Sequence, residues 1–97
     1  MRYEIVLAPE ALQDLRGLSA RNRAIVRDAI EIHLRYEPTK VSRSRIKRLR
    51  GTERPQYRLR IGEQRVFYDV SAEAVEILAI VSKSTAEEWL SRQGPET

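Results

Sequence analysis

The chain has 97 residues, a length that fits one small domain and excludes a two-domain protein. Of these residues 41% are hydrophobic and 33% are charged, a composition that fits a globular fold. It contains no cysteine, which excludes disulfides and thiolate metal sites, and a single histidine, His33, which argues against a zinc site or a histidine-centred catalytic triad. Aromatic residues make up only 6%, which argues against large stacking platforms for single-stranded nucleic acid.

The N-terminal residues do not look like a targeting segment. Their apolar run is short and is interrupted at once by Glu4, unlike the apolar region of a signal peptide. No apolar run approaches the roughly 20 residues that a membrane-spanning helix needs. We therefore expect a soluble, cytoplasmic protein without a membrane partner.

The first half of the chain predicts one strand and two helices. Alternation followed by an apolar run indicates a strand over residues 2–7. Pro9 suits the first position of a helix that ends near Gly17, and Ser19 suits the N-cap of a second helix, which Pro38 ends. Together the two helices form an α-hairpin.

The second half predicts strands after an irregular stretch. Residues 39–56 have no clean period, so we expect a mostly irregular basic connection there. Strands follow over about 57–61, 65–70 and 75–82, and the last one is apolar enough to be central in the sheet.

The C-terminal part predicts one more short helix and a tail. Ser84 or Thr85 would cap the helix, and we expect residues 93–97 to be flexible. The order is then β-α-α-β-β-β-α in a single domain over residues 1–92. This is an α+β fold with a largely antiparallel sheet and its helices on one face.

Positive charge is concentrated in one segment. Residues 40–65 hold ten lysine and arginine residues and two acidic ones, a net charge of +8, whereas the rest holds eight basic and twelve acidic residues, net −4. Such polarity suits a polyanion such as RNA or the ribosome, although a solvated basic loop is the alternative. The side chains expected to contact RNA are Arg43, Arg45, Lys47, Arg48, Arg50, Arg54 and Tyr57, the last by stacking on a base.

The segment 56–70 predicts a hairpin that places arginine against arginine. Gly62 and Glu63 suit a two-residue turn of type II′, and in that register Arg58, Arg60 and Arg65 share one face. The core face then holds Leu59, Ile61, Val66 and Tyr68. Like charges on one face destabilise a sheet, so three converging guanidinium groups indicate a site for an anion such as phosphate.

Fixed cations around a phosphate can promote RNA cleavage without a metal or cofactor. The 2′-OH attacks the adjacent phosphate, and the cations stabilise the charge that builds on its non-bridging oxygens. Arginine stays protonated, so such a cluster is an electrostatic catalyst and not an acid–base pair. The sequence shows no acidic cluster with the spacing of metal ligands that would suit metal-assisted DNA cleavage.

Residues 2–90 resemble the RelE/ParE superfamily of small bacterial toxins, and the RelE branch more closely. The resemblance rests on four segments: "APEALQDLRGL" after the opening strand, "KRLRG" at 47–51, "YRLRIGEQRVFYDV" at 57–70, and the closing "VEILAIVSK". It implies a RelE-like fold and the toxin of a type II toxin–antitoxin system. It also implies a metal-independent endoribonuclease, an mRNA interferase that cuts translated mRNA on the ribosome and so inhibits translation.

The resemblance also implies partners and site residues. The partners are a cognate antitoxin, the ribosome with its mRNA, and operator DNA through the toxin–antitoxin complex. The catalytic residues are Arg58, Arg60 and Arg65, and Lys83 replaces part of the charge of a family arginine.

At two positions the sequence differs from the family pattern. Ser84 stands where active members have an arginine, and Leu90 where they have tyrosine or histidine. Two alternatives therefore stay open: a ParE-like toxin that inhibits DNA gyrase, and a catalytically weak toxin homologue that mainly binds its antitoxin.

Overall fold

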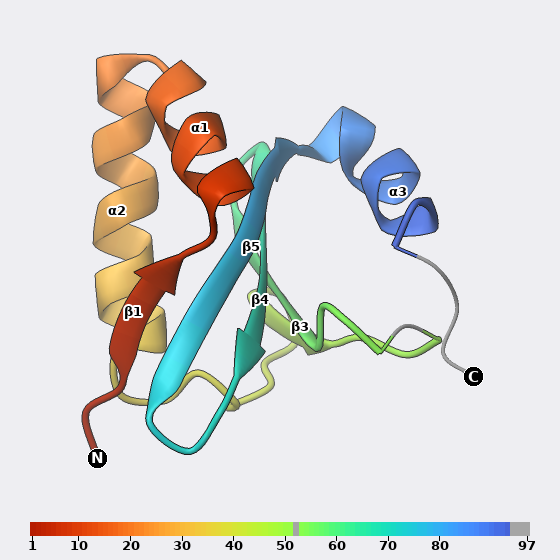
Figure 1. Ribbon diagram of the computed structural model, residues 1–97. Helices are drawn as coiled ribbons and strands as arrows, with labels where there is room; N and C mark the ends of the chain where they lie inside the picture. Colours follow the sequence, from red (N-terminus) through yellow and green to blue (C-terminus); the bar gives the residue numbers. More distant parts are fainter. Residues whose placement is uncertain (52, 94–97) are drawn as a thin grey trace.

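The computed structural model describes residues 1–51 and 53–93 and contains one five-stranded sheet with helices on both of its faces (Figure 1). The elements are β1 (Glu4–Leu7), α1 (Pro9–Gly17), α2 (Ala20–Leu34), β2 (Ile46–Arg48), β3 (Tyr57–Ile61), β4 (Gln64–Val70), β5 (Ala74–Ser82) and α3 (Lys83–Ser91). Of the tail expected at 93–97, residues 94–97 lie outside the described part. Gln93 is described, and its side-chain Nε2 donates a hydrogen bond to the Trp89 carbonyl at 2.9 Å.

The strands lie in the order β1-β5-β4-β3-β2, with only the β1–β5 pair parallel. The expected α+β fold with a largely antiparallel sheet is therefore confirmed, and β5 occupies an inner position. The strand β2 was not expected, because it lies in the segment predicted to be irregular. Ile46 secures it by packing into the core opposite Leu59, while the Ser42 hydroxyl accepts a hydrogen bond from the Ile46 amide at 3.0 Å.

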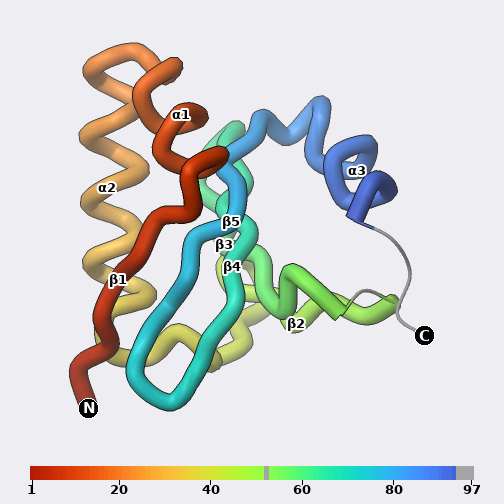
Figure 2. The backbone as a smooth tube through the Cα atoms, in the orientation of Figure 1, coloured from red at the N-terminus to blue at the C-terminus, as the bar shows by residue number. Residues whose placement is uncertain are grey.

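The signals for the start of α1 and α2 and for the end of α1 are borne out, whereas α2 ends at Leu34 and not at Pro38. Pro9 is the first residue of α1, which ends at Gly17, and the Ser19 hydroxyl accepts a hydrogen bond from the Asn22 amide at the start of α2. The backbone tube in Figure 2 shows the chain leaving α2 and running along the bottom of the view to β2.

The two faces of the sheet are covered by different helices. The larger core includes Val26 and Leu34 of α2 together with Leu59 and Tyr68 of the hairpin, so α1 and α2 cover this face. On the opposite face, here called the α3 face, the Trp89 ring stacks on Phe67 with centroids 4.9 Å apart. The expectation that all helices share one face is thus wrong, as Figure 1 shows with α3 across the sheet from α1 and α2.

The helix α3 also begins earlier than expected. It starts at Lys83 with Ser82 in the N-cap position, so neither Ser84 nor Thr85 is its cap. The Ser82 hydroxyl lies 3.1 Å from the Ser84 hydroxyl and 3.0 Å from that of Thr85. The start of α3 therefore carries a small network of hydroxyl groups.

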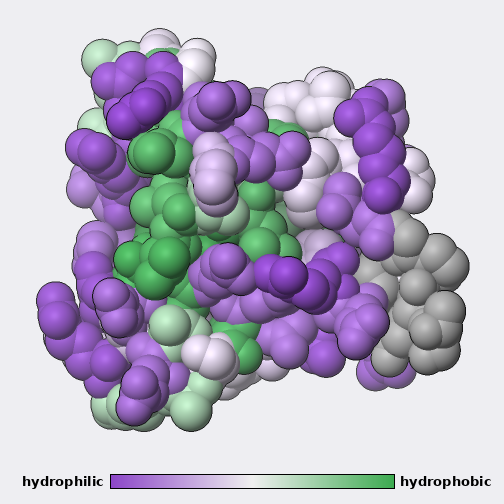
Figure 3. Space-filling model, in the orientation of Figure 1, coloured by the Kyte–Doolittle hydropathy of each residue, from purple (hydrophilic) through white to green (hydrophobic). Residues whose placement is uncertain are grey.

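The described surface is hydrophilic over most of the view in Figure 3. Hydrophobic side chains gather over β1 and the adjoining part of α1, where Val6 and Leu12 are exposed. None of the helices in residues 1–51 and 53–93 is both long and apolar enough to cross a membrane.

Candidate active site

The β3–β4 hairpin has the register that the sequence predicted. Arg60 lies directly opposite Arg65, and Arg58 opposite Phe67, so all four side chains project from the α3 face. Gly62 adopts a φ of +55°, while no described non-glycine residue has a positive φ. A positive φ at the first turn residue alone is the signature of the type II′ turn.

Arg65 differs from expectation because it is buried. Its side chain is 6% exposed, and its Nη1 donates hydrogen bonds to the carbonyls of Gly62 at 2.7 Å and Gln64 at 2.9 Å. These two bonds satisfy carbonyl groups at the hairpin turn. Arg65 therefore holds the turn, and Nε and Nη2 of its guanidinium have no hydrogen-bond partner among the described residues.

The strand β2 adds a fourth cation to the same face. Lys47 lies directly opposite Arg58 in the antiparallel β2–β3 pair. We call Lys47, Arg58, Arg60 and Arg65 the cationic cluster. It contains two like-charged cross-strand pairs side by side, and none of its members forms an ion pair with a described residue.

Arg58 lies at the centre of the cluster. Its side chain is half-buried, and its Nε is buried with no hydrogen-bond partner in the described part of the chain. Burial, reinforced by the positive charges of Arg65 and Arg60, lowers the pKa of the Arg58 guanidinium below its ordinary value. An anion bound beside Arg58 would accept a hydrogen bond from this buried donor and would offset the positive charge around it.

The start of α3 lies beside the hairpin turn. The Lys83 amide donates a hydrogen bond to the Glu63 carbonyl at 2.7 Å, which ties the exposed Lys83 to the same end of the α3 face as Arg65. Ser84 is exposed, whereas Leu90 packs against the cluster of Phe67 and Trp89. Neither Ser84 nor Leu90 supplies a positive charge or an acid–base group.

The tyrosines and the histidine lie away from the cationic cluster. Tyr68 is buried on the opposite face, where its hydroxyl donates to the Pro38 carbonyl at 2.7 Å. Burial, together with the neighbouring Tyr57, raises the pKa of the Tyr68 hydroxyl above its ordinary range. His33 belongs to α2. In the described part of the chain no group of three or more histidine, aspartate or glutamate side chains is placed to hold a metal ion.

The remaining residues expected to contact RNA are not brought to the cluster. Arg48 lies over the Tyr57 ring at 5.2 Å from its centroid, and Tyr57 itself stacks on Tyr68. Both belong to the face that α1 and α2 cover, together with Ile46. Arg43, Arg45 and Arg50 are exposed in the flanking loops.

Arg54 is already neutralised by two acids. Its Nε lies 2.6 Å from the Asp69 carboxylate and its Nη2 lies 2.7 Å from that of Glu76. Asp69 on β4 lies opposite Glu76 on β5. Along β4, Phe67 separates Asp69 from Arg65. Arg54 therefore belongs to an ion-pair network at the other end of the α3 face.

The position of Lys47 could not be read from the sequence. The sequence placed it among RNA-contacting residues but not beside Arg58, because β2 was not expected. Only the alternation in "RIKRL" hinted at a strand, and three residues are too few for a periodic signal.

The fold is shared with toxins solved in toxin–antitoxin complexes. A chain of the RelBE2 toxin–antitoxin complex of Mycobacterium tuberculosis has a TM-score of 0.71 and 26% identity, covering 84% of this chain and 99% of that chain. A chain of the archaeal RelE–RelB complex of Pyrococcus horikoshii OT3 has a TM-score of 0.69 and 26% identity, with 86% and 97% covered.

A more distant neighbour has the same fold. A chain of the RelB–RelE complex of Methanococcus jannaschii has a TM-score of 0.64 at 17% identity, with 87% of this chain and 96% of that chain covered. The sequence matches no protein-family model and no curated protein. The chain has the fold of the RelE toxins, and the similarity supports a place in the RelE-like toxin family.

Proposed function

We propose that this chain, which has the fold of the RelE toxins, is the toxin of a type II toxin–antitoxin pair and cleaves mRNA on the ribosome. The observation that carries this proposal is the cationic cluster, in which two like-charged pairs stand side by side without an acidic partner among the described residues. A sheet gains no stability from such pairs, whereas a phosphate bound among them is stabilised by every member.

In this proposal the cluster stabilises the charge that develops during cleavage. The 2′-OH of the substrate attacks the adjacent phosphorus and the P–O5′ bond breaks, which leaves a 2′,3′-cyclic phosphate; solvent water takes the proton of the 2′-OH and supplies one to the departing 5′-oxygen. Arg60 is exposed and Arg58 half-buried, so both guanidinium groups are placed to donate to the non-bridging oxygens. Arg65 holds the turn with Nη1 and adds its positive charge from beneath the surface, while Lys83 adds charge at the edge.

The proposed function implies three partners: an antitoxin, the ribosome with its mRNA, and operator DNA. The neighbours in the fold were solved with an antitoxin, and we infer that a cognate antitoxin, encoded in a short reading frame beside this gene, binds this chain. The toxin would act in the cytoplasm, where the ribosome and its mRNA are, and operator DNA would be bound through the toxin–antitoxin complex. The exposed Arg43, Arg45 and Arg50 would contact ribosomal RNA.

The test is to express the chain under tight control and map mRNA ends by primer extension. Cuts at fixed codon positions are expected with the unaltered chain and are expected to disappear in Arg60→Ala. Arg60 is the variant of choice because its side chain is exposed and makes no hydrogen bond or ion pair among the described residues. Arg27→Ala, an exposed arginine on α2, is the matched control and should cut like the unaltered chain.

A second candidate function, inhibition of DNA gyrase, is favoured by one observation. Among the described residues, the α3 face carries no histidine or tyrosine; Leu90 occupies the expected position of the acid–base group, and Ser84 the expected position of an arginine. Double-strand DNA breaks with intact mRNA on expression would establish this function and overturn the interferase. Growth without either kind of damage would instead indicate a catalytically weak homologue that mainly binds its antitoxin.

A further inference from the structure

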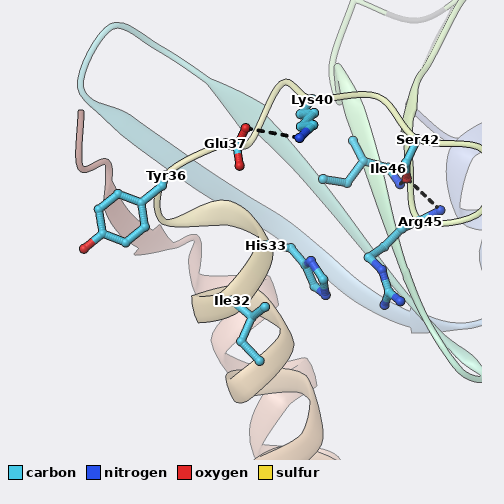
Figure 4. Close-up of a pocket in the computed structure, with 8 residues that line it drawn as sticks. All are labelled: Ile32, His33, Tyr36, Glu37, Lys40, Ser42, Arg45 and Ile46. Atoms are coloured by element: carbon cyan, nitrogen blue, oxygen red, sulfur yellow. Dashed lines mark hydrogen bonds and ion pairs between the residues drawn. The ribbon is translucent and has the colours of Figure 1, made fainter.

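A groove of about 350 Å³ lies between the C-terminal end of α2 and the segment that leads into β2. It is lined by Ile32, His33, Tyr36, Lys40, Arg45 and Ile46, among others. Figure 4 shows His33 and Arg45 side by side in it, with Ile32 on the outer side of the helix and Tyr36 pointing away from the other labelled side chains. The groove lies outside the cationic cluster, and of the residues named here the proposed function uses only Arg45, as a contact to ribosomal RNA.

The apolar side chains at the groove are exposed well beyond what the fold requires. Ile32 is 72% exposed and Tyr36 is 60% exposed, although both belong to or directly follow a helix whose other face is buried in the core. Ile46 is 4% exposed and lines the groove from the β2 side, across from the helix that carries Ile32 (Figure 4). An exposed isoleucine at the edge of a groove suits an apolar side chain of a protein partner better than it suits a charged polynucleotide backbone.

The charged side chains that line the groove are two cations, Lys40 and Arg45, and one acid, Glu37. Arg45 makes no ion pair with any described residue, and its charge adds to burial in lowering the pKa of His33. The Lys40 Nζ lies 3.5 Å from the Glu37 carboxylate, but both side chains are largely exposed, so this ion pair adds little to the stability of the fold. From residue 40 to residue 50 the chain holds six basic residues and no acid. An approaching segment is therefore favoured if it carries carboxylates.

We propose that this groove receives a segment of the cognate antitoxin in which a large apolar side chain is flanked by carboxylates. The apolar side chain would pack against Ile32 and Ile46, and the carboxylates would pair with Arg45 and Lys40. This inference rests on the proposed toxin–antitoxin pairing and adds to it the place and the chemistry of one contact.

The contact is separate from the proposed chemistry. Ile46 projects toward the face covered by α1 and α2, whereas its neighbour Lys47 projects from the α3 face with Arg58. Alternation along β2 thus divides the basic segment between two sides of the sheet. A change at Ile32 should reduce antitoxin affinity without altering cleavage.

The experiment measures the affinity of the neighbouring reading frame's protein for the full-length chain by isothermal titration calorimetry. We expect Ile32→Asp and Arg45→Glu each to raise Kd by about thirtyfold or more, the size of a hot-spot contact. The matched controls are Ile25→Asp and Arg27→Glu, which change exposed residues of the same types on α2 outside the groove and should stay within about twofold.

The outcomes separate this inference from the proposed function. Binding of all four variants as tight as that of the unaltered chain would overturn the groove contact while leaving the toxin–antitoxin pairing intact. Failure of the unaltered chain to bind would overturn the pairing and the groove contact with it. If Ile32→Asp instead abolished mRNA cleavage at unchanged antitoxin affinity, the groove would be an RNA contact and the inference would be wrong.

Discussion

At the scale of single residues, Arg58, Arg60 and Arg65 are not equivalent, although the sequence treats them alike. Arg60 is exposed, and Arg65 is buried with hydrogen bonds to the carbonyls of its own turn. Arg58 is half-buried, and its Nε has no hydrogen-bond partner among the residues that the structure describes. A buried charge needs hydrogen bonds, and Arg65 obtains them from Gly62 and Gln64. Arg65 therefore stabilises the hairpin turn in addition to adding positive charge to the cationic cluster.

We expect Arg65→Ala to lower the free energy of unfolding by about 1–3 kcal/mol, because two turn carbonyls lose a charged donor. Arg60→Ala should leave stability within about 0.5 kcal/mol or raise it slightly, because it removes one like-charged pair. Urea denaturation of the two variants measures both values. Equal midpoints for Arg65→Ala and Arg60→Ala would show that the turn does not depend on Arg65.

At the scale of elements, the hairpin followed from local rules, whereas β2 and the place of α3 did not. Alternation and the turn sequence fixed which residues of β3 and β4 stand opposite one another. The same alternation places Phe67 on the arginine face, which is left uncovered if all helices pack on the other face. In the structure Phe67 is fully buried there, because Trp89 stacks on it from α3.

We expect Trp89→Ala to lower the free energy of unfolding by about 3 kcal/mol, since it removes a largely buried indole ring from Phe67. Amide hydrogen exchange should then become faster throughout α3, while the β3–β4 hairpin stays protected. Leu12→Ala, at a partly exposed apolar position of α1, is the comparison and should have a much smaller effect. Unchanged exchange in α3 would mean that the helix is held by other contacts.

At the scale of the whole molecule, charge is distributed by face and not by segment. The basic segment contributes Lys47 to the cationic cluster and Arg45 to the groove beside α2, while Arg54 is tied to Asp69 and Glu76. Neighbouring residues of one sequence run therefore have different partners. An RNA that follows the α3 face would meet the cluster but would have to break two ion pairs to use Arg54.

We expect the affinity for a short single-stranded RNA to fall with salt, and the slope to shrink by roughly 0.7 for each phosphate contact removed. Lys47→Ala and Arg60→Ala should each reduce the slope by that amount. Arg54→Ala should leave it unchanged, because this arginine is already paired with two acids. Fluorescence anisotropy at several salt concentrations measures all three slopes, and an equal reduction for Arg54→Ala would place it in the RNA site.

The sequence by itself determined the α-hairpin, the register of the β3–β4 hairpin and the shared face of Arg58, Arg60 and Arg65. These depend on contacts a few residues apart, such as the Ser19 cap and the Gly62 turn. Only the tertiary structure decided which arginine is buried, that Lys47 stands beside Arg58, and where the groove opens. Alternation assigns a side chain to a face, but its burial depends on which distant element packs there, and that choice is made by the whole chain.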